Sequence, residues 1–388
     1  MTDPIPNSSP SQPPMYLALT GGGTAGHVWP HFALFSHPES PLLLKIQRNE
    51  LRVLYFGSQE GMERDLVTSQ EPNWMYFPLA TGKLRRYFSW KNFTDPFRVV
   101  FGFFQACVIL LKYKPKVLFS KGGFVSAPVV WAAALCRVPI VIHESDFSPA
   151  LTTKLSLPFA QNALCAFTGT LPLLGSHPDK RALGLPLRHS LFKGTKEAAQ
   201  AFFKFPNPHQ KTLLIFGGSL GALGLNEKLK PYLPLWCHKW NVIHVVGKGK
   251  SIPFQHPNYR SYEFLQKEMA LAYALADGAI SRAGASSLFE LREARIPMLL
   301  VPLATGASRG DQIENAQEFK SKGWAMVWEE VKIPFSGKIE DSPFHRAVEE
   351  LLTQKDLESS DFASASLAEL IPEPASLSVA KLITSYLI

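Results

Sequence analysis

The chain has 388 residues, which is too long for one ordinary core and predicts two domains. Its composition, 46% hydrophobic and 19% charged, is typical of a soluble globular protein. The longest uncharged apolar run, Val99 to Leu111, falls short of the roughly 18 to 20 residues that span a bilayer, so no membrane-spanning segment is predicted. The net charge of +8 favours an anionic partner.

Targeting and cysteine patterns favour the cytosol. Residues 1–14 contain five prolines and are predicted to form a disordered tail. The N-terminus has no basic region followed by an apolar one, so a secretory signal is not expected. The four cysteines are widely spaced and form no C-x-x-C pair, which argues against a disulfide framework or a zinc site.

Short apolar runs alternate with longer helical stretches along the whole chain, as in parallel α/β sheets. The strands predicted in the first half are Met15–Leu19, Leu51–Phe56, Val117–Phe119 and Pro139–Ile142. The pattern restarts after Leu187 and Arg188, with strands predicted at Thr212–Phe216, Val242–Val246, Gly278–Ser281 and Pro297–Val301. The fold class predicted is therefore α/β, with two doubly wound domains that meet near residue 190 and face each other across a cleft.

A glycine-rich turn follows the first predicted strand of each half. The first, residues 19–27, reads Leu-Thr-Gly-Gly-Gly-Thr-Ala-Gly-His, and its amides at a helix start suit a phosphate group. Gly21, Gly23 and Gly26 also match the dinucleotide-binding spacing, but that match is weak by itself. The second predicted strand ends in Gly57-Ser58 instead of the acid that would hold a ribose, which argues against an NAD enzyme.

A second phosphate site is predicted at residues 281–290, where a strand ends in Ser-Arg-Ala-Gly-Ala and a helix begins. The amides near Ser286 and Ser287 suit a phosphate, and the Glu290 carboxylate can accept hydrogen bonds from two ribose hydroxyls. This pattern is expected for a nucleotide-diphosphate donor. The alternative is a surface helix whose glutamate is merely solvated.

The segment from Lys83 to Lys114 is basic and aromatic. It holds seven Lys or Arg residues against one acid, Asp95, with nine aromatic residues interleaved. Such a segment is typical of an interfacial anchor on an anionic bilayer. The alternative, aromatic residues in a core and cations on a solvated face, carries about equal weight. Nucleic-acid binding is not favoured, because no nucleic-acid module accompanies the segment.

Five motifs together resemble the MurG family of glycosyltransferases. They are Gly22-Gly23-Thr24-Ala25-Gly26-His27, residues 120–126 (Ser-Lys-Gly-Gly-Phe-Val-Ser), His143-Glu144-Ser145-Asp146, residues 217–221 (Gly-Gly-Ser-Leu-Gly) and Arg282-Ala283-Gly284-Ala285 with Glu290. The resemblance runs in order from about Tyr16 to Asn315.

The resemblance implies an enzyme that moves N-acetylglucosamine (GlcNAc) from UDP-GlcNAc to lipid I, giving lipid II in peptidoglycan synthesis, with inversion at the anomeric carbon. It implies a GT-B fold of two Rossmann-like domains, with the acceptor and membrane on 15–189, UDP-GlcNAc on 190–370, and a helix in 371–388 that returns to the first domain. No cofactor or metal is implied. A peripheral protein at the cytoplasmic face of the cell (inner) membrane is expected. A cell-wall synthesis complex is expected as a further partner, and roles in cell shape and division are expected as well.

The resemblance also assigns site residues. His27 is the candidate general base. Its rival role is to donate to a phosphate or to cap the helix. The other candidates, for the base or for orienting the sugars, are Glu144, Asp146 and His143. Residues 264–269 would lie beside the uracil. Residues matching the donor and sugar site are Thr24, Ala25, Gly26, Asp146, Arg188, Ser219, Arg282, Ser286, Ser287, Glu290, Asp311, Gln312 and Asn315. Residues matching the acceptor diphosphate site are Gly22, Gly23, Lys83, Arg86, Gly122 and Gly123.

Other functions remain open on the sequence alone. A GT-B enzyme that glycosylates diacylglycerol, a sugar-nucleotide epimerase, or a non-catalytic sugar-nucleotide-binding membrane protein would share much of this pattern. Asp146 stands where many family members have an amide, so its role is the least secure of those assigned.

Overall fold

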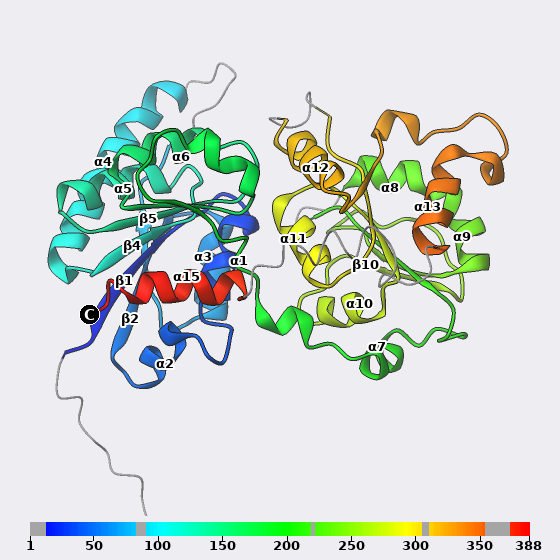
Figure 1. The fold of residues 1–388 in the computed structure, drawn as a ribbon, viewed down its shortest axis with the longest axis horizontal. Helices are drawn as coiled ribbons and strands as arrows, with labels where there is room; N and C mark the ends of the chain where they lie inside the picture. The colour runs from blue at the N-terminus through cyan, green and yellow to red at the C-terminus, as the bar shows by residue number, and fades with distance from the viewer. Residues whose placement is uncertain (1–12, 83–90, 219–221, 305–309, 354–372) are drawn as a thin grey trace, which may run out of the picture. The chain divides into compact units, whose positions relative to one another are not determined.

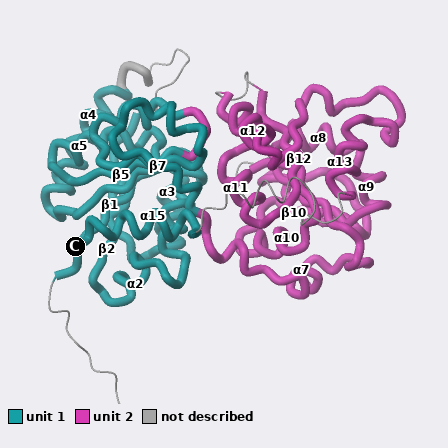
Figure 2. The backbone as a smooth tube through the Cα atoms, in the orientation of Figure 1, with its two compact units in different colours: residues 1–144, 149–186, 373–388 teal, residues 145–148, 187–372 magenta. Residues whose placement is uncertain are grey.

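The computed structural model describes residues 13–82, 91–218, 222–304, 310–353 and 373–388, without the side chains of 91–94. These residues form two compact units (Figure 2). Unit 1 comprises residues 1–144, 149–186 and 373–388, and unit 2 comprises 145–148 and 187–372. The expected tail, apart from its last two residues, and the site residues Lys83, Arg86 and Ser219 lie outside the described residues.

Unit 1 is built on a seven-stranded parallel sheet in the order β3-β2-β1-β4-β5-β6-β7. This order, in which the chain starts in the middle and winds outward in both directions, is that of a Rossmann-like domain. The strands are β1 (Met15–Thr20), β2 (Leu51–Ser58), β3 (Met75–Leu79), β4 (Val117–Ser120), β5 (Ile140–Glu144), β6 (Asn162–Cys165) and β7 (Lys180–Ala182).

Apolar side chains on both faces of the sheet form two cores. On β1, Leu17 and Leu19 point to one face and Ala18 points to the other, which explains why its sequence is apolar without alternation. The first face is covered by α1 (Trp29–Ala33), α2 (Pro41–Gln47), α3 (Met62–Gln70) and α15 (Ala375–Thr384) (Figure 1). The second carries α4 (Lys91–Tyr113) and α5 (Ser126–Leu135), with α6 (Leu151–Ser156) beside α5.

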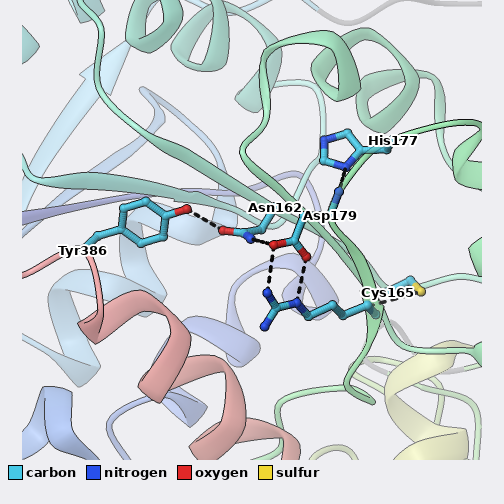
Figure 3. A network of polar contacts seen from close by, with 6 residues as sticks. Asn162, Cys165, His177, Asp179 and Tyr386 are labelled. Carbon is cyan, nitrogen blue, oxygen red and sulfur yellow. Dashed lines mark hydrogen bonds and ion pairs between the residues drawn. The ribbon is translucent and has the colours of Figure 1, made fainter.

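The last helix of the chain, α15, belongs to unit 1. Val379, Ala380 and Ile383 are fully buried in the core that β1 and β2 form. Beyond the helix, the Tyr386 hydroxyl donates to the side-chain oxygen of Asn162 on β6 at 2.6 Å (Figure 3). Asn162 donates in turn to Asp179, which also accepts two hydrogen bonds from Arg181. The C-terminus is therefore fixed to the sheet by both apolar and polar contacts.

Unit 2 repeats the architecture with a six-stranded parallel sheet in the order β10-β9-β8-β11-β12-β13. Its strands are β8 (Thr212–Phe216), β9 (Asn241–Val245), β10 (Tyr259–Tyr262), β11 (Gly278–Ser281), β12 (Met298–Leu300) and β13 (Met326–Val327). Its helices include α7 (Lys196–Phe203), α8 (Leu223–Leu229), α9 (Leu233–Lys239), α10 (Met269–Leu275), α11 (Ala285–Glu293), α12 (Asp311–Ser321) and α13 (Pro343–Thr353). A core around Trp236, Tyr232 and Phe344 joins α8, α9 and α13 to the sheet.

The predicted α/β class with two Rossmann-like sheets is confirmed, and two strands, β8 and β11, match their predicted bounds. The sequence missed β3, β6, β7, β10 and β13. Four of these are at sheet edges, where one side needs no strand partner and polar residues are tolerated.

Helix α4 is longer than the apolar run Val99 to Leu111 indicated. Among the described residues, its segment Asp95–Tyr113 is long and apolar enough to cross a membrane by length and composition alone. The difference arises because the run of uncharged residues ends at Arg98 and Lys112, whereas the helix continues through both. Gly102 brings the helix against the sheet, since a Cβ there would lie 2.1 Å from the Ala80 carbonyl oxygen.

Candidate active site

The first glycine-rich turn lies at the carboxyl end of β1, where parallel α/β domains bind their ligands. The helix that the sequence predicted to begin at this turn begins two residues after it. Residues Ala25–His27 form one turn of 3₁₀ helix, and α1 starts at Trp29. Gly23 has φ +89°, a backbone conformation that favours glycine. The Tyr55 hydroxyl of β2 stabilises the turn by donating to the Gly21 carbonyl at 2.8 Å.

His27 is partly exposed at the end of this turn and is linked to Thr24. The Thr24 Oγ1 and His27 Nδ1 atoms lie 3.0 Å apart. If Nδ1 carries the ring proton and donates it to Thr24, Nε2 is the acceptor nitrogen. The pair therefore provides a means of setting the tautomer that a histidine base requires.

The second glycine pair touches the first turn directly. Gly122 and Gly123, which follow β4, have φ values of +80° and +84°. A Cβ on Gly123 would lie 2.2 Å from the Gly22 carbonyl oxygen, so only glycine permits this approach. The structure thus brings together the two glycine pairs that the sequence predicted to share a ligand.

Residues 143 and 144 at the end of β5 make internal contacts. His143 Nδ1 lies 2.7 Å from the amine of Lys121, and Nε2 lies 2.9 Å from the Gly184 carbonyl, so both ring nitrogens are engaged. Burial lowers the pKa of His143 well below its ordinary value, and the charge of Lys121 lowers it further. Glu144 accepts from the Ala150 amide at 2.9 Å and from Thr153 at 2.5 Å, both at the start of α6. These contacts suit support of the site better than proton transfer.

In unit 2, the predicted phosphate-binding helix is α11, which begins after Gly284, with Ser286 and Ser287 in its first turn. Glu290 follows on the second turn, as the sequence predicted. Its Oε2 atom accepts a hydrogen bond of 2.6 Å from the Tyr273 hydroxyl of α10. Burial raises the pKa of Glu290 above its ordinary value, and the Tyr273 hydrogen bond and the Arg188 charge only partly oppose this. Glu290, Tyr273 and Arg188 therefore form one electrostatic cluster.

Arg282, which the sequence predicted to contact the substrate, makes several contacts within unit 2. It is 4% exposed, and its Nη1 atom donates to the Val301 carbonyl at 3.0 Å and to Glu330 at 2.7 Å. Although burial opposes it, hydrogen bonds from Arg282 and Lys228 hold the pKa of Glu330 below its ordinary value. These contacts make Arg282 a support for the strand ends.

The residues expected at the sugar lie on α12. Asp311 and Gln312 are in its first turn and partly exposed, and Gln312 accepts from the Leu303 amide at 3.1 Å. Asn315 is fully buried and donates to Asp146 at 3.0 Å and to the Ala283 carbonyl at 3.2 Å. Both amide hydrogens of Asn315 are thus donated within unit 2, and Asp146 is the partner of one.

The described residues contain no group of three His, Cys, Asp or Glu side chains placed to hold a metal ion. Phe264, at the start of the segment expected beside the uracil, is 53% exposed, and Leu265 and Met269 are buried.

Comparison with known families matches both halves of the chain. Residues 17–165 match the family model "Glycosyltransferase family 28 N-terminal domain", and residues 212–359 match "Glycosyltransferase family 28 C-terminal domain". The chain belongs to glycosyltransferase family 28. The two matches correspond to unit 1 and unit 2, each with its own glycine turn.

Curated relatives of this family 28 glycosyltransferase share one name, UDP-N-acetylglucosamine--N-acetylmuramyl-(pentapeptide) pyrophosphoryl-undecaprenol N-acetylglucosamine transferase. The protein from Clostridium perfringens (strain SM101) is 42% identical over 320 residues, covering 82% of this chain and 86% of the relative. The protein from Staphylococcus aureus (strain MRSA252) is 41% identical with the same coverage.

Solved structures show the same fold at lower identity. MurG of Acinetobacter baumannii superposes with a TM-score of 0.67 at 23% identity, covering 96% of this chain and all of that one. The calicheamicin glycosyltransferase CalG4 superposes with a TM-score of 0.65 at 14% identity, covering 97% of this chain and 99% of that one. The family 28 chain therefore has the GT-B glycosyltransferase fold.

The structure adds two residues that the sequence did not single out. Tyr273 is 5% exposed and lies 17 positions before its partner Glu290. Glu63 is fully buried beside the first glycine turn, 40 positions after it. Each looks like an ordinary helix residue in the sequence, and no local motif marks either one.

Proposed function

We propose that the chain transfers GlcNAc from UDP-GlcNAc to the C4 hydroxyl of the MurNAc-pentapeptide of lipid I, giving lipid II and UDP. The observation that carries the proposal is the identity of 41 to 42% across both domains to relatives that bear the name of this activity. The position of Glu290 after a helix start also suits a nucleotide-diphosphate sugar.

The donor site that we propose lies on unit 2. Glu290 would accept hydrogen bonds from the ribose hydroxyls, since its second oxygen remains available for them when Oε2 bonds Tyr273. The first amides of α11, at Ser286 and Ser287, would receive the diphosphate together with Arg188, and Ser219 completes the proposed set. Residues 264–269 would lie beside the uracil.

For the sugar, we propose Asp311 and Gln312 as the groups that read the GlcNAc hydroxyls. Asn315 and Asp146 were expected to contact the sugar too. Because they bond each other, and Asn315 also accepts from the Phe147 amide at 2.8 Å, we assign them to positioning the loop at 145–148.

The acceptor diphosphate is proposed to bind at the glycine turns of unit 1. Gly22, Gly122 and Gly123 supply backbone without side chains at the place where the turns touch. Thr24, Ala25 and Gly26 follow in the same turn, and Lys83 and Arg86 would add positive charge. The Gly23 amide is directed to Glu63 at 3.2 Å, so other amides must receive the phosphate.

We propose His27 as the general base. In the transfer step, Nε2 of His27 takes the proton from the C4 hydroxyl, the oxygen forms a bond to C1 of GlcNAc, and the bond from C1 to the UDP oxygen breaks. Thr24 would hold the proton on Nδ1, which leaves Nε2 as the acceptor. Glu144 positions α6 near this site through Ala150 and Thr153 and is not a proton acceptor in this scheme.

A membrane surface is the second proposed partner, and α4 is the element that supports it. One side of α4 packs on the sheet through Ala106 and Leu110. The other side exposes six large apolar residues at helical spacing: Phe97, Val100, Phe101, Phe104, Val108 and Leu111. An exposed apolar face of this size, within a segment rich in Lys and Arg, is typical of interfacial binding. We therefore propose peripheral binding at the cytoplasmic face of the inner membrane. At that place the protein would also contact a cell-wall synthesis complex and would act in cell shape and division.

One assay tests the proposed activity. Purified protein is incubated with radiolabelled UDP-GlcNAc and either lipid I or diacylglycerol in detergent, and the label in the extracted lipid is counted. We expect label in the lipid I sample alone. Label in diacylglycerol would support the alternative glycolipid transferase, and label that stays on UDP with both acceptors would refute transfer.

A further inference from the structure

The helix after β2, α3, reaches the first glycine turn through the side chain of Glu63. Glu63 lies in the first turn of α3, and its carboxylate is fully buried. One oxygen, Oε1, accepts hydrogen bonds from the Ser58 amide at 3.0 Å and from the Ser58 hydroxyl at 2.5 Å. The other, Oε2, accepts from the Gly23 amide at 3.2 Å. The carboxylate therefore joins the ends of two neighbouring strands, β1 and β2.

Two glycines leave room for this carboxylate. A Cβ on Gly22 would lie 2.8 Å from both the carboxyl carbon and Oε1 of Glu63. A Cβ on Gly61 would lie 2.2 Å from the same Oε1 and 2.3 Å from Oε2. All of these distances are below 3.0 Å, so a Cβ at Gly22 or Gly61 would require the Glu63 carboxylate to shift. The glycine turn is thus shaped by its partner side chain as well as by its ligand.

We propose that Glu63 is a positioning residue for the transfer reaction, which holds the first glycine turn in the conformation that presents its outward amides and His27 to the acceptor. The inference rests on the proposed binding of the lipid I diphosphate at this turn. Because Glu63 is fully buried, it acts through the turn and not by touching the substrate.

The chemistry of the three hydrogen bonds explains why a carboxylate is needed. All three partners are donors, and an ionised carboxylate is a pure acceptor. A glutamine in the same place would have to turn its NH₂ group toward at least one of these donors. It would therefore break one side of the connection while keeping the size of the side chain. Hydrogen bonds to a charged acceptor are also stronger than neutral ones, so this loss loosens the turn.

The test is the variant Glu63→Gln, with Glu60→Gln as a matched control. Glu60 lies three positions earlier, is exposed, and loses the same charge. We expect Glu63→Gln to lower kcat/KM for lipid I by about ten-fold or more, with the affinity for UDP unchanged because unit 2 is untouched. Glu60→Gln is expected to match wild type in both. A folded Glu63→Gln variant with wild-type kcat/KM for lipid I, or an equal loss of UDP affinity, would overturn the inference.

Ser58→Ala provides a second, milder variant. It removes the hydroxyl that donates to Oε1 but keeps the Gly23 contact, so we expect a smaller loss in the same direction, of about two- to five-fold. If Glu63→Gln fails to fold, an unchanged kcat/KM in Ser58→Ala decides against the proposal. Wild-type protein that transfers no label to lipid I would instead refute the proposed function, so the two failures are distinguishable.

Discussion

The exposed side of α4 gives a membrane-binding prediction that can be calculated from the structure. The perturbation is the triple replacement Phe97→Ala, Phe101→Ala and Phe104→Ala. These side chains are 78%, 60% and 59% exposed, so their removal leaves the core of unit 1 intact. Alanine also keeps the helix propensity high.

The expected size of the effect follows from the exposed area. A phenylalanine presents about 200 Å² when fully open, so each of the three rings exposes roughly 130 Å² on average. At about 25 cal/mol per Å², full burial of one ring stabilises the bound state by about 3 kcal/mol. An interfacial helix buries about half of this surface, which leaves about 5 kcal/mol for the three rings together. The partition coefficient should then fall by about 10³- to 10⁴-fold.

The assay is co-sedimentation with vesicles that contain anionic phospholipid. A matched control, Leu223→Ala with Val331→Ala, removes exposed apolar residues from unit 2, which are 52% and 71% exposed. We expect wild-type partitioning in the control and a large loss in the triple variant. Equal binding of the triple variant and wild type would refute the assignment of α4 as the membrane contact.

Three further predictions concern the site. His27→Ala should reduce kcat by about 10² to 10⁴ with UDP-GlcNAc affinity nearly unchanged, and near-wild-type turnover in the lipid I assay would exclude it as the base. Because burial raises the folded pKa of Glu290, its contribution to stability is present below the ordinary value of 4.5 and is lost as pH rises through the folded pKa. In the proposed donor site Glu290 accepts from the ribose hydroxyls as an ionised carboxylate, so UDP affinity should fall on the acid side of that pKa. Tyr273→Phe removes a hydrogen bond that lowers the pKa of Glu290 and should move this fall to higher pH. Calorimetric titration of UDP into both proteins over a series of pH values would contradict this if the two affinity curves coincide. Gly123→Ala should lower the free energy of unfolding of unit 1 by about 2 kcal/mol or more, because its Cβ would meet the Gly22 carbonyl; an unchanged melting midpoint would show that the turns can separate.

How far the sequence predicted the fold depended on burial. Strands β8 and β11 lie at the centre of their sheet, are covered on both faces, and consist of small or apolar residues that mark them clearly. Strand β10 reads Tyr-Arg-Ser-Tyr and lies at an edge, where its arginine donates to the carbonyl of Phe203. Such a segment has no apolar pattern to detect, so β10 was missed.

The candidate site was predictable where it is local in sequence. Each glycine turn, and the helix that carries Glu290, is a run of consecutive residues. The residue types in such a run indicate the backbone conformation that it adopts. Contacts between distant segments were not. The sequence did not indicate that Arg282 pairs with Glu330, 48 positions later, or that Glu63 contacts the Gly23 amide.

The return of α15 to unit 1 has a consequence for the order in which the protein is made. The core around β1 includes Val379 and Ile383 of α15, so this core is complete only after residues 375–384 have left the ribosome. Most of unit 2, residues 187–372, is synthesised earlier as a continuous stretch. During synthesis the first domain to begin is therefore completed after most of the second, and a nascent chain that stops before residue 373 lacks the α15 part of the cover on this face of the first sheet.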